Sequence, residues 1–159
     1  MRRTSIKRKQ MLVIMLTSCV SLLLACGGFV AYEIITYRQT VVENLRTAGI
    51  FVAVSAGNDG SACSTVTTPA AIFDAVFSVG STTSSDAASS FSSRGPVTVD
   101  GSNRMKPDIA APGSSVRSSV PGGGYSTLSG TSMAGPHVAG LVGLLVSAVP
   151  AAAGDVDRL

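Results

Sequence analysis

Two long apolar stretches, one near each end, dominate the hydrophobic pattern of the chain. Residues 11–32 contain no charge, and a helix of this length crosses a hydrocarbon core of about 30 Å. Residues 138–149 are also uncharged and follow a cluster of small residues, which predicts a buried helix over residues 131–149. Pro136 falls in the opening turns of this helix, where proline costs least, and Pro150 ends it.

Between the two apolar stretches, short β-branched runs alternate with turn residues, which is typical of an α/β protein. Residues 49–54 are apolar and β-branched, and the turn residues 57–60 follow them, which predicts a buried parallel strand and then a loop. The remaining predictions are a short strand at 75–80, a loop at 81–93, a hairpin formed by 115–119 and 125–129, and a frayed tail at 151–159.

A serine lies in the first turn of the predicted C-terminal helix. At this position Ser132 is close to N–H groups that lack an intrahelical partner and to the positive end of the helix dipole. Such a setting helps to stabilise negative charge on an attacked carbonyl oxygen. The surrounding residues 130–140, Gly-Thr-Ser-Met-Ala-Gly-Pro-His-Val-Ala-Gly, closely resemble the nucleophile motif of the subtilases, the subtilisin-like serine peptidases. The resemblance implies that Ser132 is a catalytic nucleophile.

A second motif lies at the end of the predicted strand 49–54. The run that ends in Asn58 resembles the subtilase strand whose terminal asparagine donates a hydrogen bond to the oxyanion. The sequence Asn-Asp-Gly also suits an ordinary turn. Because Ser132 is in the same chain, the resemblance favours Asn58 as the oxyanion-hole donor.

The resemblance to the subtilases covers about residues 47–150 and corresponds to the C-terminal half of their catalytic domain. It implies an α/β fold with a partial subtilisin-like parallel sheet and the nucleophile helix, preceded here by one N-terminal transmembrane helix. It continues through the connecting segments 91–96, 106–113 and 120–125. By the same resemblance, the substrate-binding residues, which form one wall of the primary specificity pocket, are Ser55, Ala56, Gly57, Thr67, Thr68 and Pro69.

The subtilase mechanism also needs a base for the serine and a carboxylate that orients the base. In the family both precede the serine, in Asp-Thr/Ser-Gly and His-Gly-Thr-His motifs, and neither motif occurs in this sequence. The single histidine, His137, follows Ser132 by five residues, so helical geometry turns its side chain about 140° away. We therefore interpret His137 as a packed helix residue, and Asp108 as a structural carboxylate.

The N-terminal apolar stretch has a basic flank and is predicted to be a signal anchor. The flank should stay in the cytoplasm, which leaves the rest of the chain outside. The alternatives are a cleaved signal peptide and a lipoprotein signal, because residues 23–27 resemble a lipobox with Cys26 as the lipidated residue. Residues 1–46 also resemble the membrane segment of bacterial sensor histidine kinases, through residues 9–16 and 29–33. The basic residues are Arg2, Arg3, Lys7, Arg8 and Lys9.

The net charge of +3 belongs to this leader, so it indicates membrane orientation and not nucleic-acid binding. Of the three cysteines, Cys63 alone lies in the peptidase-like part, and it has no evident intrachain partner there. No metal ligands or cofactor are predicted, although the family resemblance allows calcium. The predicted segments are a cytoplasmic segment 1–10, a transmembrane helix or anchor 11–32, a connecting helix 33–46, a truncated peptidase domain 47–150 and a tail 151–159.

These features predict a membrane-anchored serine endopeptidase domain that is inactive alone, because its catalytic aspartate and histidine are missing. Its partners would be protein or peptide substrates, the membrane, and a complementing peptidase half. The alternative is a non-catalytic, membrane-tethered interaction module or a gene fragment. Because a parallel sheet needs cover on both faces, residues 47–159 alone are predicted to expose apolar helix surface and to fold poorly.

Overall fold

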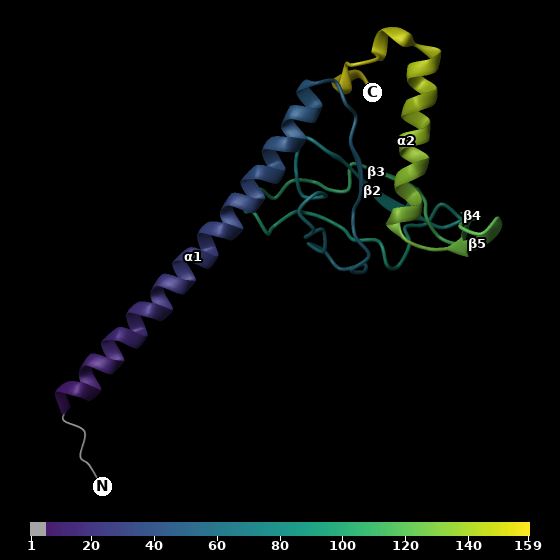
Figure 1. The fold of residues 1–159 in the computed structure, drawn as a ribbon. Coiled ribbons are helices and arrows are strands. Elements are labelled where there is room, and N and C mark those ends of the chain that lie inside the picture. The colour runs from purple at the N-terminus through teal and green to yellow at the C-terminus, as the bar shows by residue number, and fades with distance from the viewer. Residues whose placement is uncertain (1–5) are drawn as a thin grey trace. The chain divides into compact units, whose positions relative to one another are not determined.

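The computed structural model describes the backbone of residues 6–159 and the side chains of residues 20, 21 and 23–159. The chain divides into two compact units, Met1–Tyr37 and Arg38–Leu159. The boundary between the units falls within the sequence of helix α1, Ile6–Thr47, which Figure 1 labels. The predicted span at residues 11–32 lies within α1, but many of its side chains lie outside the described residues, so a membrane-spanning role stays a prediction.

A three-stranded parallel sheet forms the centre of the second unit. Its strand order is β1-β2-β3, so β2 is the middle strand and pairs with both neighbours. This arrangement confirms the predicted α/β architecture with a parallel sheet. The strands are β1 (Ala53–Ser55), β2 (Phe77–Thr82) and β3 (Ile109–Pro112).

Strand β1 is shorter and less buried than the sequence predicted. The apolar run at residues 49–54 predicted a buried strand, whereas the strand comprises only Ala53–Ser55 and all three residues are half-buried. The physical reason is its position at the edge of the sheet, where only one side of the strand is paired. Apolar sequence therefore predicted the strand correctly but not its burial.

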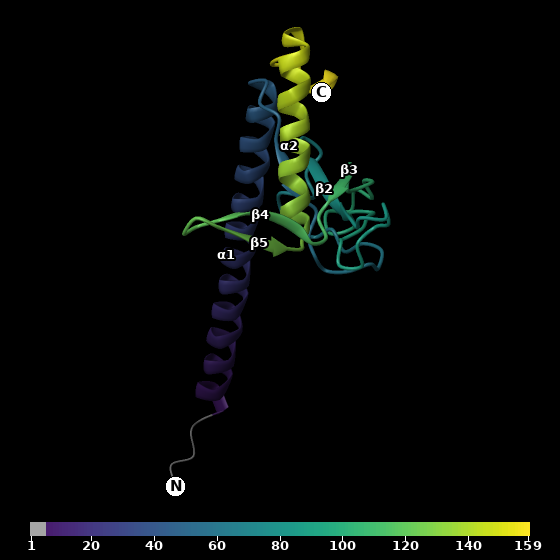
Figure 2. The same ribbon diagram turned by 90° about the vertical axis from the view of Figure 1, so that its right-hand side faces the viewer.

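Apolar side chains pack on the sheet in two clusters. One cluster contains Val66 and Val97, and Val42 near the end of α1 packs against it. The other contains Val79 from β2 and Val138 from helix α2 (Thr131–Ala148). Helix α2 packs on all three strands and covers one face of the sheet (Figure 2).

Helix α2 has the predicted extent, but only its first half is buried. Its buried residues all precede residue 139, whereas Leu144 is 71% exposed and Val149 is 53% exposed. The prediction of a buried helix therefore holds for its first half only, and the exposed second half agrees with the expectation that this helix exposes apolar surface. By length and composition alone, α2 is also the one helix among the searched residues that could cross a membrane, a test that a core helix passes too.

The predicted hairpin is present, and the predicted frayed tail is structured instead. Strands β4 (Val116–Val120) and β5 (Gly124–Leu128) pair antiparallel next to the N-terminal end of α2 (Figure 2). The tail forms two short 3-10 helices, Pro150–Ala152 and Val156–Arg158.

The tail is ordered because it contacts the end of α1. Arg46 forms an ion pair with Asp157, whose hydrogen bond and negative charge raise the pKa of the Arg46 guanidinium. Gly154 lies directly against Gly49, since a Cβ on Gly49 would come within 2.6 Å of the Gly154 Cα. These contacts join residues far apart in sequence, which a local pattern does not reveal.

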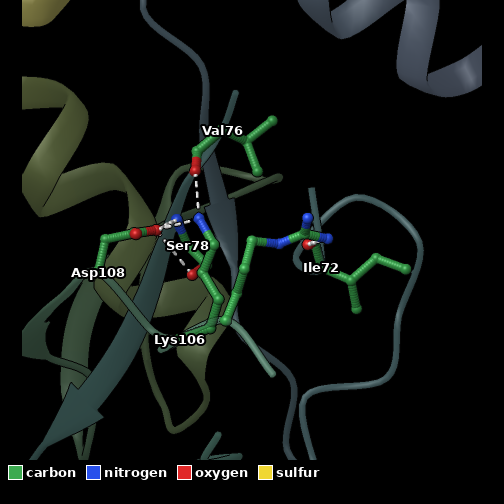
Figure 3. Close-up of polar contacts among 6 residues, drawn as sticks. Ile72, Val76, Ser78, Lys106 and Asp108 are labelled. Atoms are coloured by element: carbon green, nitrogen blue, oxygen red, sulfur yellow. Dashed lines mark hydrogen bonds and ion pairs between the residues drawn. The ribbon is translucent and has the colours of Figure 1, made fainter. Parts of the chain in front are cut away.

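A buried lysine connects β2 with the segment that leads into β3. Lys106 is only 5% exposed, and its Nζ donates to the Val76 carbonyl at 2.8 Å and to Asp108 Oδ2 at 2.7 Å. The same Oδ2 accepts from the backbone N and the hydroxyl of Ser78, at 2.7 and 2.9 Å. Figure 3 shows these donors converging on the carboxylate. Asp108 thus has the structural role that the sequence indicated.

Candidate active site

Ser132 is the second residue of α2, and it is exposed at the start of the helix. The residue at the N-cap position is Gly130, which provides no side-chain hydrogen bond to the first turn. Several N–H groups of this turn therefore lack an intrahelical partner, as at any helix N-terminus. The serine hydroxyl occupies the electrostatic setting that the sequence predicted.

The side-chain amide of Asn58 is fixed against the residue that precedes Ser132. Its Oδ1 accepts hydrogen bonds from the Thr131 backbone N at 2.9 Å and from the Thr131 hydroxyl at 3.1 Å. Because a backbone N–H can only donate, the amide atom that faces it is the oxygen. The Nδ2 group is then left to donate elsewhere. It lies beside the serine turn, 3.5 Å from where a Cβ on Gly130 would be.

Thr131 also contributes to this site, although no motif in the sequence singles it out. The side chain is fully buried, and its hydroxyl also accepts a 3.3 Å hydrogen bond from the backbone N of Gly57. One hydroxyl thus connects both residues of the 57–58 turn to the start of α2. The sequence signal that was available is a hydroxyl residue directly before the candidate nucleophile.

The turn that carries Asn58 can only be built with glycine at position 57. Gly57 has a φ of 110°, and a Cβ there would lie 2.8 Å from the Ser93 hydroxyl oxygen. Ser93 holds the turn from the other side, because its hydroxyl accepts from the backbone N of Asp59 at 3.0 Å and its own N donates to the Gly57 carbonyl at 3.0 Å. Ser93 therefore fixes the backbone on both sides of Asn58 in the sequence, at Gly57 and at Asp59.

Gly113 also holds the serine turn, through a backbone hydrogen bond. Its carbonyl accepts from the Gly130 backbone N at 2.8 Å, and a Cβ on Gly113 would lie 2.4 Å from the Ser81 hydroxyl oxygen. The backbone N of Ser115 donates to the Ser129 hydroxyl at 2.9 Å. The segment 113–115 thus positions Ser129 and Gly130, which precede Ser132 by three and two residues.

Serine hydroxyl groups next to Gly113 form a chain of hydrogen bonds. Ser81 and Ser89 share a 2.8 Å hydrogen bond, and Ser89 shares another of 2.8 Å with Ser114. Ser92 accepts from the Ser81 backbone N at 3.0 Å. The polar composition of residues 81–93 predicted a loop, but residues 81 and 82 belong to β2, which is Phe77–Thr82 and not 75–80 as predicted. The rest of the loop is internal in part because its hydroxyl groups satisfy one another.

A pocket of about 350 Å³ opens beside Ser132, between β4 and the first turns of α2. It combines apolar walls with the hydroxyl group of the candidate nucleophile and one guanidinium group. Its lining residues are Val116, Arg117, Ser118, Ser132, Met133, Pro136 and His137.

His137 is exposed at this pocket, which corrects its interpretation as a packed helix residue. The reason is that this side of α2 borders the open pocket between α2 and β4. Its Nδ1 lies 2.9 Å from the Met133 carbonyl oxygen, which can only accept, so Nδ1 donates this hydrogen bond. No hydrogen bond among the described residues joins His137 to Ser132, which agrees with the predicted angular separation.

The predicted substrate-binding residues form two separate groups in the structure. Residues 55–57 lie at the end of β1, directly before Asn58, and Ala56 is buried with its N–H on the Val79 carbonyl at 3.0 Å. Residues 67–69 lie in another turn, where both threonines are exposed. No hydrogen bond within the described part of the chain joins the two groups, so their shared pocket stays a prediction.

The described residues contain no cluster of three or more His, Cys, Asp or Glu side chains that could hold a metal ion. Cys26 and Cys63 are exposed and free, and the side chain of Cys19 lies outside the described ones. Calcium binding, which the family resemblance allows, therefore stays without a candidate site.

Comparison with known proteins identifies the family of this chain. Residues 25–156 match the subtilase family, peptidase S8. The chain belongs to the subtilase family. The match begins within α1, ahead of residue 47, where the motif resemblance began.

Individual relatives agree with this membership. Subtilisin E of Bacillus subtilis (strain 168) is 42% identical over 116 residues, which are 72% of this chain and 28% of that protein. Subtilisin-like protease 4 of Trichophyton rubrum is 46% identical over 104 residues, 65% of this chain and 23% of that protein. The solved structure of Sphericase aligns with a TM-score of 0.62 at 30% identity, over 74% of this chain and 40% of that chain. The chain thus spans less than a third of the length of these two curated relatives.

Proposed function

We propose that this subtilase chain carries the nucleophile and the oxyanion donor of a serine endopeptidase site. The supporting observation is the pair of hydrogen bonds from Thr131 to Asn58 Oδ1, which holds the Asn58 Nδ2 group beside the turn of Ser132. A peptide carbonyl attacked by Ser132 Oγ would develop negative charge next to this Nδ2 group and to the N-terminus of α2. Both stabilise an oxyanion.

The reaction that fits these groups is acyl transfer from a peptide. Ser132 Oγ bonds to the carbonyl carbon and loses its proton to a base, and the tetrahedral oxyanion then expels the amine, which takes up the proton. Water subsequently releases the acyl group from the serine. Residues 47–150 contain neither the aspartate nor the histidine motif of the family, so we propose that the base comes from outside this segment.

Covalent labelling tests the proposed role of the serine. The full chain should react slowly with a fluorophosphonate at Ser132, and the Ser132→Ala variant should not react. An Asn58→Ala variant should react about 10²–10³ times more slowly, because it lacks the oxyanion donor. Mass spectrometry of the labelled peptide gives the site and the rate. A wild-type chain without label at Ser132, or equal rates for wild type and Asn58→Ala, would contradict the proposal.

We further propose that α1 anchors the chain in a membrane, with the peptidase-like part outside the cytoplasm. The uncharged run 11–32 and its basic flank support this, and so do Leu23 and Leu24, whose side chains are each 72% exposed. Fractionation of expressing bacteria tests it. An intact chain in the membrane fraction supports a signal anchor, and a soluble chain without its leader indicates a cleaved signal. Lipid attachment that the Cys26→Ser variant abolishes indicates a lipoprotein.

A non-catalytic interaction module is the second candidate function, and the exposed apolar half of α2 favours it. The two functions differ in their dependence on the serine hydroxyl. A Ser132→Ala variant that loses peptide hydrolysis but keeps a binding partner would separate catalysis from binding. The subtilase family acts on protein or peptide substrates, so we propose substrates of this class for the first candidate function.

A further inference from the structure

The ammonium group of Lys106 lies where a carbonyl oxygen and a carboxylate oxygen converge. Its Nζ is 2.8 Å from the Val76 carbonyl oxygen and 2.7 Å from Asp108 Oδ2 (Figure 3). Carbonyl and carboxylate oxygens are the ligands that hard cations such as calcium prefer. The cation between these oxygens is here a lysine side chain, and the residue is only 5% exposed.

A second cationic side chain binds the same stretch of backbone. Arg104 Nη2 donates to the Ile72 carbonyl at 2.8 Å, and Arg104 also forms an ion pair with Asp100. Segment 72–76 thus directs two carbonyl oxygens at positive charges from segment 104–106. In both cases the positive charge belongs to the chain itself.

The lysine contacts join β2 and β3 where the two strands enter the sheet. Val76 directly precedes β2, and Asp108 directly precedes β3. The Asp108 backbone N also donates to the Ser78 carbonyl at 2.9 Å. A cation at this junction neutralises the carboxylate and binds the carbonyl at the same time. Because polar and charged groups are costly to shield from water without a partner, the junction depends on that cation.

Small ions in solvent can reach this junction. A pocket of about 250 Å³ is lined by Val76 and Asp108, and two further carboxylates, Asp74 and Asp157, line it as well. Arg46, the one cationic residue in its lining, is paired with Asp157. A cation from solvent would therefore be attracted to these oxygens if the lysine side chain were shortened.

The described residues do not fit a bound calcium ion, which the family resemblance allows. They contain no group of three or more His, Cys, Asp or Glu side chains that could hold a metal ion, and the oxygens around Lys106 already have their cation. We propose that the Lys106 ammonium group is an internal cation that takes the place of a metal ion at the junction of β2 and β3. This part of the chain then keeps its structure without calcium. The inference concerns the stability of the sheet and is independent of the proposed role of Ser132.

Hydrogen exchange of the full chain in detergent micelles tests the proposal. Peptides that cover residues 72–80 and 104–112 report on the junction, and mass spectrometry compares their exchange in millimolar calcium and in EDTA. Wild-type exchange should be the same in both solutions. The Lys106→Ala variant should exchange about tenfold faster in EDTA, because the Val76 carbonyl and Asp108 have lost their cation.

Chemical rescue distinguishes a cation site from ordinary packing. Propylammonium contains the atoms that Lys106→Ala removes, and calcium supplies charge of the same sign, so each should slow the exchange of this variant again. Lys106→Met fills the space with an uncharged side chain, so it should exchange faster than wild type and respond to neither ion. Met105→Ala is the matched control, because Met105 is the adjacent residue and is 83% exposed, and it should behave as wild type.

Three results would overturn the proposal, and restoration of Lys106→Ala by either ion supports it. A wild-type chain whose exchange slows with calcium or rises with EDTA still needs a metal ion, and this comparison does not require any variant to fold. Wild-type exchange in Lys106→Ala would show that the ammonium group is not needed. Faster exchange or unfolding that neither calcium nor propylammonium reverses would show that packing, and not charge, holds the two strands.

Discussion

At the scale of single residues, one hydroxyl group links the two motifs that the sequence indicated. The Thr131 side chain donates to Asn58 Oδ1 and accepts from the Gly57 backbone N, and it is fully buried. Removing a partner from a buried polar group costs more than an average hydrogen bond contributes. The orientation of the Asn58 amide, the proposed oxyanion donor, therefore depends on Thr131.

A Thr131→Val substitution should show this dependence. It keeps the shape of the side chain but leaves the Gly57 N–H without its partner, at a cost of about 1–3 kcal/mol in the free energy of unfolding. Urea unfolding gives this cost, and the rate of fluorophosphonate labelling at Ser132 reports the site. The Thr131→Ser control retains the hydroxyl and should stay close to wild type in both. A valine variant that equals the serine variant would refute the bridging role.

The buried lysine gives a second prediction at this scale. A Lys106→Met substitution removes the donor to the Val76 carbonyl and the cation beside Asp108, so the unfolding free energy should fall by about 1–3 kcal/mol. Ser78 still donates to the carboxylate and limits the loss. The exposed Arg94→Met is the control and should change stability by less than about 0.5 kcal/mol. A Lys106→Met variant as stable as this control would show that the ion pair is not needed.

At the scale of elements, the serine turn is held where the backbone of Gly113 comes close to the backbone of Gly130. The Gly113 carbonyl binds the Gly130 N–H, and the Ser81 hydroxyl group leaves no space for a side chain at position 113. A glycine in the exposed part of α2 has no such function, because a Cβ on Gly143 would meet no atom within 4 Å. The same residue type therefore has opposite consequences in these two elements.

Paired alanine substitutions test this contrast. Gly113→Ala should lower the unfolding free energy by about 1–3 kcal/mol through overpacking, and it should slow labelling at Ser132 because the turn moves. Gly143→Ala should raise stability by about 0.5–1 kcal/mol, because alanine favours a helix more than glycine does. Thermal unfolding of the full chain compares the two. Similar effects of both variants would contradict the proposed contact at Gly113.

At the scale of the whole molecule, the second half of α2 decides how the peptidase-like part behaves. Leu141 and Leu144 expose apolar side chains to solvent, and β1 presents the unpaired backbone groups of a sheet edge. Exposed areas of this kind favour association. The structure thus agrees with the sequence-based prediction that the helix exposes apolar surface.

Residues 47–159 without the leader should therefore melt without a sharp transition and associate as concentration rises. Sedimentation and calorimetry give both properties. The double variant Leu141→Lys, Leu144→Lys should associate less, because it places charge on the exposed side of α2 without touching the buried residues. Sharp cooperative melting of a monomer with dispersed amide signals would disprove the prediction.

The sequence by itself determined the family, the parallel sheet, the hairpin, the extent of α2, and the candidate pair Asn58 and Ser132. Hydrophobic periodicity and short motifs are local, so they can be recognised without knowing what packs against them. Only the tertiary structure decided the half-burial of β1, the exposure of His137 and the ordered tail. It also decided the roles of Thr131 and Gly113. These features depend on contacts between residues far apart in the chain and on which surfaces are covered, and no local pattern contains that information.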